Sequence, residues 1–148
     1  MKNRTWLAAL ALVVAVAGAA CSTDVNGIEN SPPPALAGDT VTTATGLKYI
    51  EAEVGTGATA HMGGTAAVHY TLWLLNGTFV ETSRNGSPYT FTLGSSIAGF
   101  DQGVAGMKVG GKRRLIVPPS LGYGSTAQGP IPANSTLIFD VELRAASN

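Results

Sequence analysis

Two alternating stretches decide the fold of this 148-residue chain: AAVHYTLWLLNG at residues 66–77 and LIFDVELR at residues 137–144. In the second stretch every odd-numbered residue is apolar, whereas Asp140, Glu142 and Arg144 occupy even-numbered positions. A β-strand points successive side chains to opposite faces, so this alternation predicts strands with one face in a core. The first stretch ends at Asn76-Gly77, which is a strong signal for a hairpin turn.

Shorter segments on either side fit the same architecture. We expect further strands at residues 47–54, from residue 78 onward, at residues 89–93 and at residues 113–117, each bounded by Gly or Pro. Residues 97–107 are the one helix candidate, and the glycines within them keep that helix short. Strands joined by hairpins around one short helix predict an antiparallel α+β domain.

Composition and charge exclude several classes of protein. Nine basic residues balance nine acidic ones without forming a basic stripe, so no nucleic-acid partner is expected. Cys21 is the single cysteine, and His61 and His69 lie far from it in sequence, so neither an intrachain disulfide nor a metal site is expected. The chain has no nucleophile elbow, phosphate loop or dinucleotide fingerprint. An enzyme built from it would work without a cofactor, a metal or a covalent intermediate.

The N-terminal residues have the layout of an export signal. Lys2 and Arg4 precede the apolar run Trp6–Ala17, which is followed by small residues up to Ala20. This pattern predicts a secretory signal peptide at residues 1–20. A transmembrane anchor is the alternative, but the apolar run is shorter than the roughly 20 residues that a spanning helix needs.

Cys21 follows the small residues directly and resembles the lipidated cysteine of bacterial lipoproteins. That resemblance implies lipid attachment at Cys21, and Ser22 after it favours an outer-membrane lipoprotein on the periplasmic side. A plain signal peptide that leaves Cys21 as a free thiol is the alternative. Residues 21–40 lack hydrophobic periodicity and include a triple proline, so we expect a flexible tether there and one domain at residues 41–148.

Five pieces of sequence, in order, resemble the FKBP-type peptidyl-prolyl cis-trans isomerase domain. No single piece is specific, but together they cover nearly all of residues 46–143. They are Val68-His69-Tyr70-Thr71 with Asn76-Gly77 and Thr82-Ser83-Arg84; Gly99-Phe100-Asp101-Gln102-Gly103; Met107-Lys108-Val109-Gly110; Pro118-Pro119 with Leu121-Gly122-Tyr123-Gly124; and Ile131-Pro132 with the closing segment 137–143.

The resemblance implies an antiparallel half-barrel of about five strands wrapped around one short helix, with an apolar pocket between them. It assigns Phe100 to the pocket floor, the Tyr123 hydroxyl and the Ile97 amide to substrate carbonyls, and Ile131 to an overhanging loop. The remaining residues that it implies are the walls Tyr70, Phe91 and Phe139, the carboxylate Glu81, and the substrate contacts Val80, Tyr89 and Ser96.

Periodicity alone gives simpler interpretations for several of these residues. The pocket aromatics would be ordinary core residues, and the basic cluster at residues 112–114 would be solvated strand ends. The pair Val80-Glu81 stands where the family usually has Phe-Asp, and Phe79 comes one place early. Since a shift of one residue reverses the face of a strand, Phe79 is expected opposite the pocket.

The implied function is isomerisation of X-Pro bonds in proline-containing unfolded or partly folded polypeptides outside the cytoplasm. The alternatives are a non-catalytic proline-peptide binding module or chaperone of the same fold and a purely structural surface lipoprotein. The resemblance also implies binding of macrolides such as FK506 and rapamycin, without any cofactor. We expect a monomer held to the membrane through its N-terminal lipid.

Overall fold

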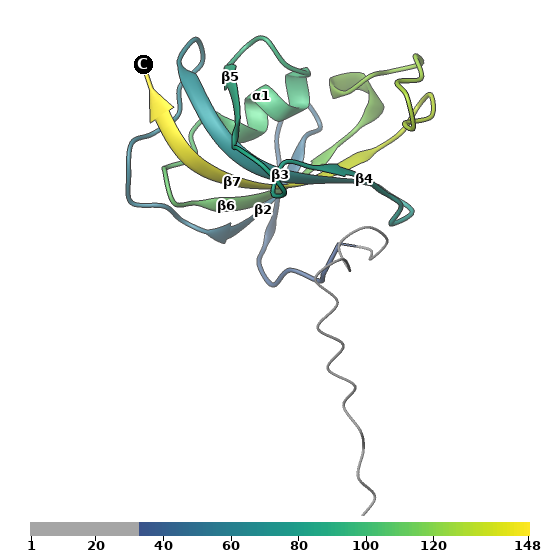
Figure 1. Ribbon diagram of the computed structural model, residues 1–148. Coiled ribbons are helices and arrows are strands. Elements are labelled where there is room, and N and C mark those ends of the chain that lie inside the picture. Colours follow the sequence, from purple (N-terminus) through teal and green to yellow (C-terminus); the bar gives the residue numbers. More distant parts are fainter. Residues whose placement is uncertain (1–32) are drawn as a thin grey trace, which may run out of the picture.

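The computed structural model describes residues 33–148, in which a curved antiparallel sheet wraps around one short helix (Figure 1). Its strand order is β1-β2-β6-β7-β3-β4, and β5 pairs with the same edge of β3 as β4. The elements are β1 (Thr40–Thr42), β2 (Lys48–Glu53), β3 (Thr65–Leu74), β4 (Phe79–Thr82), β5 (Tyr89–Thr92), α1 (Ala98–Val104), β6 (Lys112–Val117), the 3-10 turn η1 (Pro119–Leu121) and β7 (Leu137–Ser147).

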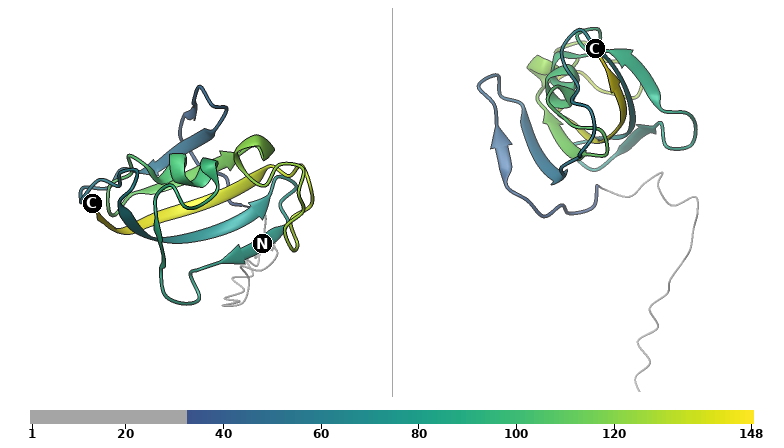
Figure 2. Two further views of the ribbon diagram at one scale, coloured as in Figure 1. Left: turned by 90° about the horizontal axis from the view of Figure 1, so that it is seen from above. Right: turned by 90° about the vertical axis from the view of Figure 1, so that its left-hand side faces the viewer.

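The predicted fold class is confirmed, with seven strands in place of about five. The added elements are short and give little sequence signal: the three residues of β1 are all exposed, so no alternation marks them. The long strands β3 and β7 lie side by side and pair from Thr65 to Leu74, as both views in Figure 2 show. This pairing forms the centre of the sheet.

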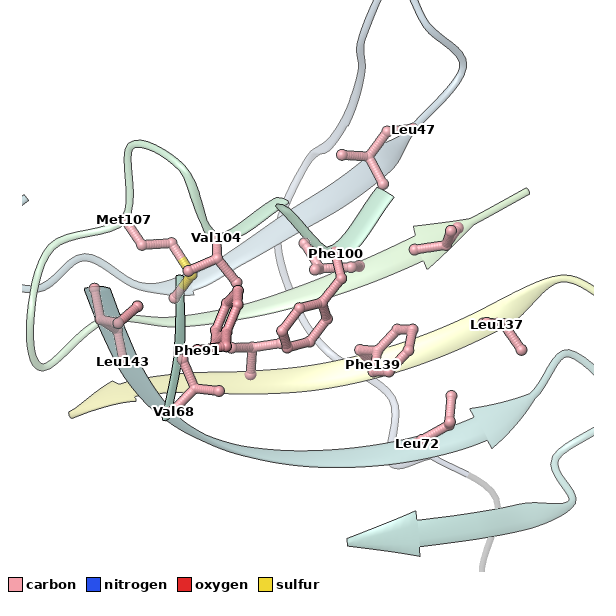
Figure 3. Packing of buried hydrophobic residues seen from close by; sticks show 14 of the residues in the cluster. Leu47, Val68, Leu72, Phe91, Phe100, Val104, Met107, Leu137, Phe139 and Leu143 are labelled. Atoms are coloured by element: carbon pink, nitrogen blue, oxygen red, sulfur yellow. The ribbon is translucent and has the colours of Figure 1, made fainter. Parts of the chain in front are cut away.

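The core lies between the helix and the concave face of the sheet. The predicted alternation of β7 is confirmed, because Leu137, Phe139, Val141 and Leu143 are all at most 5% exposed. Figure 3 shows Phe139 on this strand facing Phe100 across the interior. Burying one such side chain contributes about 1.5–3 kcal/mol to folding, so this single face of β7 is a major source of stability.

The helix lies unusually close to β6 because glycines face the sheet. A Cβ placed on Gly99 would overlap Val117, and one placed on Gly103 would overlap Leu115. The two glycines are four residues apart and therefore occupy one face of the helix. The helix ends at Val104 and is thus shorter than the predicted 97–107 segment, because Ala105 leaves helical geometry.

The expectation that the basic cluster consists of solvated strand ends is wrong for two of its three members. Arg113 is on the helix side of the sheet, where its Nε donates to Glu51 at 2.9 Å and its Nη1 donates to the Gly103 carbonyl at 2.8 Å. Arg114 is on the convex face and forms a bidentate pair with Asp140, at 2.6 and 2.7 Å. Only Lys112 is a solvated strand-end cation, paired with an exposed glutamate.

Arg114 also joins the domain to the segment that precedes β1. Its Nη1 donates to the Pro34 carbonyl at 2.7 Å, and Leu36 lines a hollow on the convex face with Asp140. These contacts extend the packed part of the chain N-terminal of the expected boundary at Val41. Residues 1–32, which include the predicted signal peptide and Cys21, lie outside the described residues. No helix within residues 33–148 is long and apolar enough to span a bilayer.

We predict that Gly103→Ala destabilises the fold by about 1–3 kcal/mol, because the new methyl group overpacks against Leu115, which is fully buried. The overpacking acts against the higher helix propensity of alanine, which by itself would stabilise a helix interior by about 1 kcal/mol relative to glycine. Urea unfolding of both proteins measures the difference. Gly86→Ala is the control, since a Cβ there meets no atom within 4 Å. A Gly103→Ala protein as stable as the control would show that the helix has room to move.

Candidate active site

A cavity of about 190 Å³ opens between the concave face of the sheet and the N-terminal end of α1. Its walls come from β3, β4, β5 and β7, from the segment before α1, from α1 itself and from the loop after η1. The lining residues are Tyr70, Leu72, Glu81, Tyr89, Ser96, Ile97, Phe100, Tyr123 and Phe139.

The floor of this cavity is aromatic. The ring centroids of Phe100 and Phe139 are 5.0 Å apart, and the Tyr70 ring meets both at 5.9 and 6.1 Å. Phe100 and Phe139 are 3% and 5% exposed. Such tilted and edge-on contacts stabilise aromatic clusters beyond the area that they bury. The floor is therefore a closely packed aromatic surface.

A β-bulge aims the carboxylate of Glu81 at this floor. On β3, Leu72 pairs with Glu81 while the next residue, Trp73, pairs with Phe79, so Val80 is the extra residue of the bulge. Glu81 consequently shares the cavity face of Leu72, and Phe79 shares the opposite face with Trp73, as expected. The Tyr70 hydroxyl donates to Glu81 Oε1 at 2.8 Å.

Two of the three tyrosines that line the cavity have a raised pKa. Burial, and then the hydrogen bond to the Glu81 carboxylate, raises the pKa of Tyr70 well above its usual range. Burial, followed by the negative charge of Glu81, also raises the pKa of Tyr123. Within residues 33–148 no group is hydrogen-bonded to the Tyr123 hydroxyl, which leaves it available as a donor at the rim.

The segment before α1 contributes a backbone donor. Ile97 begins the helix, and its carbonyl accepts the Phe100 and Asp101 amides at 3.0 and 3.1 Å. Its own amide donates to no group in the part of the chain that the structure describes. The neighbouring Ser96 amide is bonded instead to Asp101 Oδ2 at 3.0 Å. Ile97 therefore lines the cavity and has a backbone N–H without a partner among residues 33–148.

Eight of the eleven predicted pocket residues line the cavity: Tyr70, Glu81, Tyr89, Ser96, Ile97, Phe100, Tyr123 and Phe139. Phe91 does not, because it lies behind the wall, where its ring is 5.3 Å from those of both Tyr89 and Phe100. Val80 packs against the core as the bulge residue, and Ile131 is a core residue at 5% exposure. Among residues 33–148 no group of three or more His, Cys, Asp or Glu side chains could hold a metal ion.

Sequence reasoning omitted Leu72 from the lining. The sequence could have placed Leu72 in the cavity, because it is two residues from Tyr70 on the same strand and its side chain must point to the same face. The cavity as a whole can hold a short apolar group against aromatic rings while hydrogen bonds orient the polar atoms beside it. It contains no nucleophile paired with a general base.

Comparisons with known proteins agree with this geometry. The family model described as FKBP-type peptidyl-prolyl cis-trans isomerase matches residues 57–144. FK506-binding protein 3 of Candida albicans is 48% identical over 93 residues, covering 62% of this chain and 22% of that protein. FK506-binding protein 4 of Neurospora crassa is 44% identical over 118 residues, or 78% of this chain and 24% of that one.

Solved structures show the same likeness in three dimensions. FkpA from Escherichia coli superposes with a TM-score of 0.70 at 38% identity, covering 73% of this chain and 51% of that one. AtFKBP13 gives a TM-score of 0.69 at 35% identity, covering 74% of this chain and 99% of that one. The chain spans only about a quarter of the length of the curated relatives described above.

We predict that Tyr70 and Tyr123 ionise above the usual pH range of a tyrosine in an alkaline titration of tyrosinate absorbance. Since the folded pKa of Tyr70 exceeds its unfolded value of about 10, the folded state keeps a proton that the unfolded chain loses. Stability should therefore be unaffected by this group below pH 10 and fall above it. Tyr70→Phe should remove the late-ionising group and lessen that fall, and an unchanged curve would contradict the burial of the Tyr70 hydroxyl.

Proposed function

The chain belongs to the FKBP-type peptidyl-prolyl cis-trans isomerase family, and we propose that it catalyses the cis-trans isomerisation of X-Pro bonds. The single observation that carries the proposal is the aromatic cavity, in which Phe100 and Phe139 form a dry floor beneath free hydrogen-bond donors. Because the chain is much shorter than its curated relatives, the proposal concerns this domain alone.

The chemistry requires no proton transfer and no covalent step. An amide resists rotation because its C–N bond has partial double-bond character, and uncatalysed X-Pro isomerisation takes tens of seconds. The twisted amide loses resonance and carries less charge on its oxygen than the planar one. Water stabilises the planar, charge-separated form, so transfer to an apolar cavity favours the twisted state in relative terms.

Fixed donors then hold the peptide on either side of the rotating bond. We assign the Ile97 amide and the Tyr123 hydroxyl to two carbonyls of the substrate, with the proline ring against Phe100. Both donors lack a partner among residues 33–148, so no hydrogen bond within that part of the chain has to break before they bind the peptide. Glu81 acts through Tyr70, whose hydroxyl it holds in place at 2.8 Å.

Proline-containing unfolded or partly folded polypeptides are the proposed substrates, and acceleration of proline-limited folding is the proposed role. Macrolides of the FK506 type are proposed ligands of the same cavity, since relatives of this chain carry the name FK506-binding protein. The protein is proposed to act as a monomer without a cofactor.

We further propose that the protein is a bacterial lipoprotein exported to the periplasmic side of the outer membrane. The support is in the sequence: a charged start at Lys2 and Arg4, an apolar run, small residues, and then Cys21 followed by Ser22. Lipid on Cys21 would hold the isomerase domain at the membrane surface.

The isomerase proposal predicts that the protein accelerates exchange in short X-Pro peptides. Tyr123→Phe should lower kcat/KM about three- to tenfold, since one hydrogen bond of roughly 1 kcal/mol is lost. Phe139→Leu should lower it further, because the aromatic floor loses its fit to the proline ring. Tyr49→Phe is the control, as Tyr49 lies outside the cavity beside Arg113. Exchange is followed by NMR line shapes of the proline signals.

The same assay separates the enzyme from a binding module. A protein that binds an unfolded polypeptide or FK506 without accelerating exchange would be a proline-peptide binding module or chaperone of this fold. A protein that does neither would contradict both interpretations of the cavity.

The lipoprotein proposal predicts that Cys21→Ser releases the protein from the membrane fraction of a bacterium with two membranes. The wild-type protein should carry acyl groups on its mature N-terminus, and the variant should carry none, because serine lacks the thiol that accepts the lipid. Mass spectrometry of both proteins measures the modification. Ser31→Ala, in the same segment, should leave the fractionation unchanged, and acylation that survives Cys21→Ser would exclude this attachment site.

A further inference from the structure

Asp101 is a buried carboxyl group directly beneath the cavity, although it does not line it. It follows the floor residue Phe100 in the first turn of α1 and is 3% exposed. Its Oδ2 accepts the Ser96 amide at 3.0 Å, whereas its Oδ1 is fully buried without a hydrogen-bond partner among residues 33–148. A buried polar atom without a partner costs about 1–3 kcal/mol, so stability alone does not account for a carboxyl group here.

The single bond to Ser96 determines the path of the chain into the helix. Ile97 at the start of α1 has no side-chain cap. Asp101 replaces that cap by reaching back to an amide ahead of the helix, much as the acidic residue of a capping box does. The short segment before Ile97 is otherwise held by the Ser95 amide, which donates to the Thr92 carbonyl at 3.1 Å.

The position of the Ile97 amide depends on this arrangement. The bond to Asp101 anchors the peptide plane that precedes the one carrying the Ile97 amide. The Ile97 carbonyl, which accepts the Phe100 and Asp101 amides, anchors the plane that follows it. The Ile97 amide is therefore confined between two fixed peptide planes. The Ile97 amide is then left free at the cavity wall. A loss of the Asp101 bond would release the plane on the N-terminal side, and the Ile97 amide would then be held from its C-terminal side alone.

We propose that Asp101 is a positioning residue whose carboxyl holds the Ser96 amide and thereby aims the Ile97 amide at the substrate carbonyl. The inference rests on the proposed isomerase function and adds a residue that touches no substrate. Its effect is on how well the peptide is held, so Asp101 should influence KM more than kcat.

The test compares Asp101→Asn, Asp101→Leu and Gln102→Ala in the full chain. Asparagine keeps an oxygen for the Ser96 amide, leucine keeps the branched shape without an acceptor, and Gln102 accepts the Thr45 hydroxyl at 2.7 Å on the same helix, outside the cavity lining. Kinetics with X-Pro peptides, urea unfolding and amide NMR spectra are recorded for each protein, at a temperature where the variants remain folded.

Asp101→Leu should raise KM about five- to tenfold with a smaller change in kcat, as expected when one oriented hydrogen bond is lost. The KM of Asp101→Asn should stay within about twofold of the wild-type KM, and the KM of Gln102→Ala should equal it. A leucine variant that loses stability but keeps KM, or an asparagine variant as impaired as the leucine one, would overturn the positioning role.

Two further measurements keep the test decisive. If Asp101→Leu does not fold, hydrogen exchange of the Ser96 amide in Asp101→Asn replaces it. An Asp101→Asn protein in which the Ser96 amide stays protected from exchange and KM stays at the wild-type value supports the proposal. One in which the Ser96 amide loses its protection while KM is unchanged overturns it. If the wild type binds a proline peptide without turnover, the isomerase proposal fails by itself. Positioning is then read from the Ile97 amide signal, which should shift on peptide addition in the wild type and not in Asp101→Leu; equal shifts would overturn it.

Discussion

The cavity depends on how closely α1 approaches β6. Gly99 and Gly103 present no side chains to Val117 and Leu115, so the helix axis lies nearer the sheet than most residues would allow. This close approach places the ring centroids of Phe100 and Phe139 5.0 Å apart, and the two rings together close the cavity floor. Because a protein interior is packed as densely as a crystal, moving the helix away from the sheet by the width of a methyl group would separate these rings. The packing of the helix against β6 therefore also determines the geometry of the cavity floor.

Around that floor the polar groups are arranged without a free charge aimed at the substrate. Glu81 reaches the rim only because the bulge at Val80 rotates β4, and its carboxylate is bonded to Tyr70. Burial raises the pKa values of Tyr70 and Tyr123, so both hydroxyls remain neutral donors at physiological pH. The site is thus suited to a reaction in which charge separation decreases, and poorly suited to acid-base chemistry.

The alternation that one buried face imposes on β3 and β7 predicted the central strands, whereas most of the cavity was predicted by the resemblance to the FKBP-type domain. The sequence did not reveal the bulge at Val80, since an extra residue leaves no compositional trace. Nor did it show that Tyr89 lines the cavity and Phe91 does not. Both side chains point to the same face of β5, and the depth at which each is buried determines which of them borders the cavity.

Long-range pairing was equally hidden from the sequence. Nothing near Arg113 or Arg114 in the chain identifies Glu51 and Asp140 as partners, because the pairs join residues that only the sheet brings together. Two cations that look solvated in sequence are consequently structural, and only Lys112 behaves as composition suggests.

The contact between Arg114 and the Pro34 carbonyl fixes where the chain enters the domain. That entry point is on the convex face of the sheet, and the helix covers the opposite face (Figure 1). The cavity opens on the concave side beside the helix. Within residues 33–148 the chain therefore enters the domain from the back of the sheet. A polypeptide that reaches the cavity from the concave side therefore does not meet the segment around Pro34 that leads into the domain.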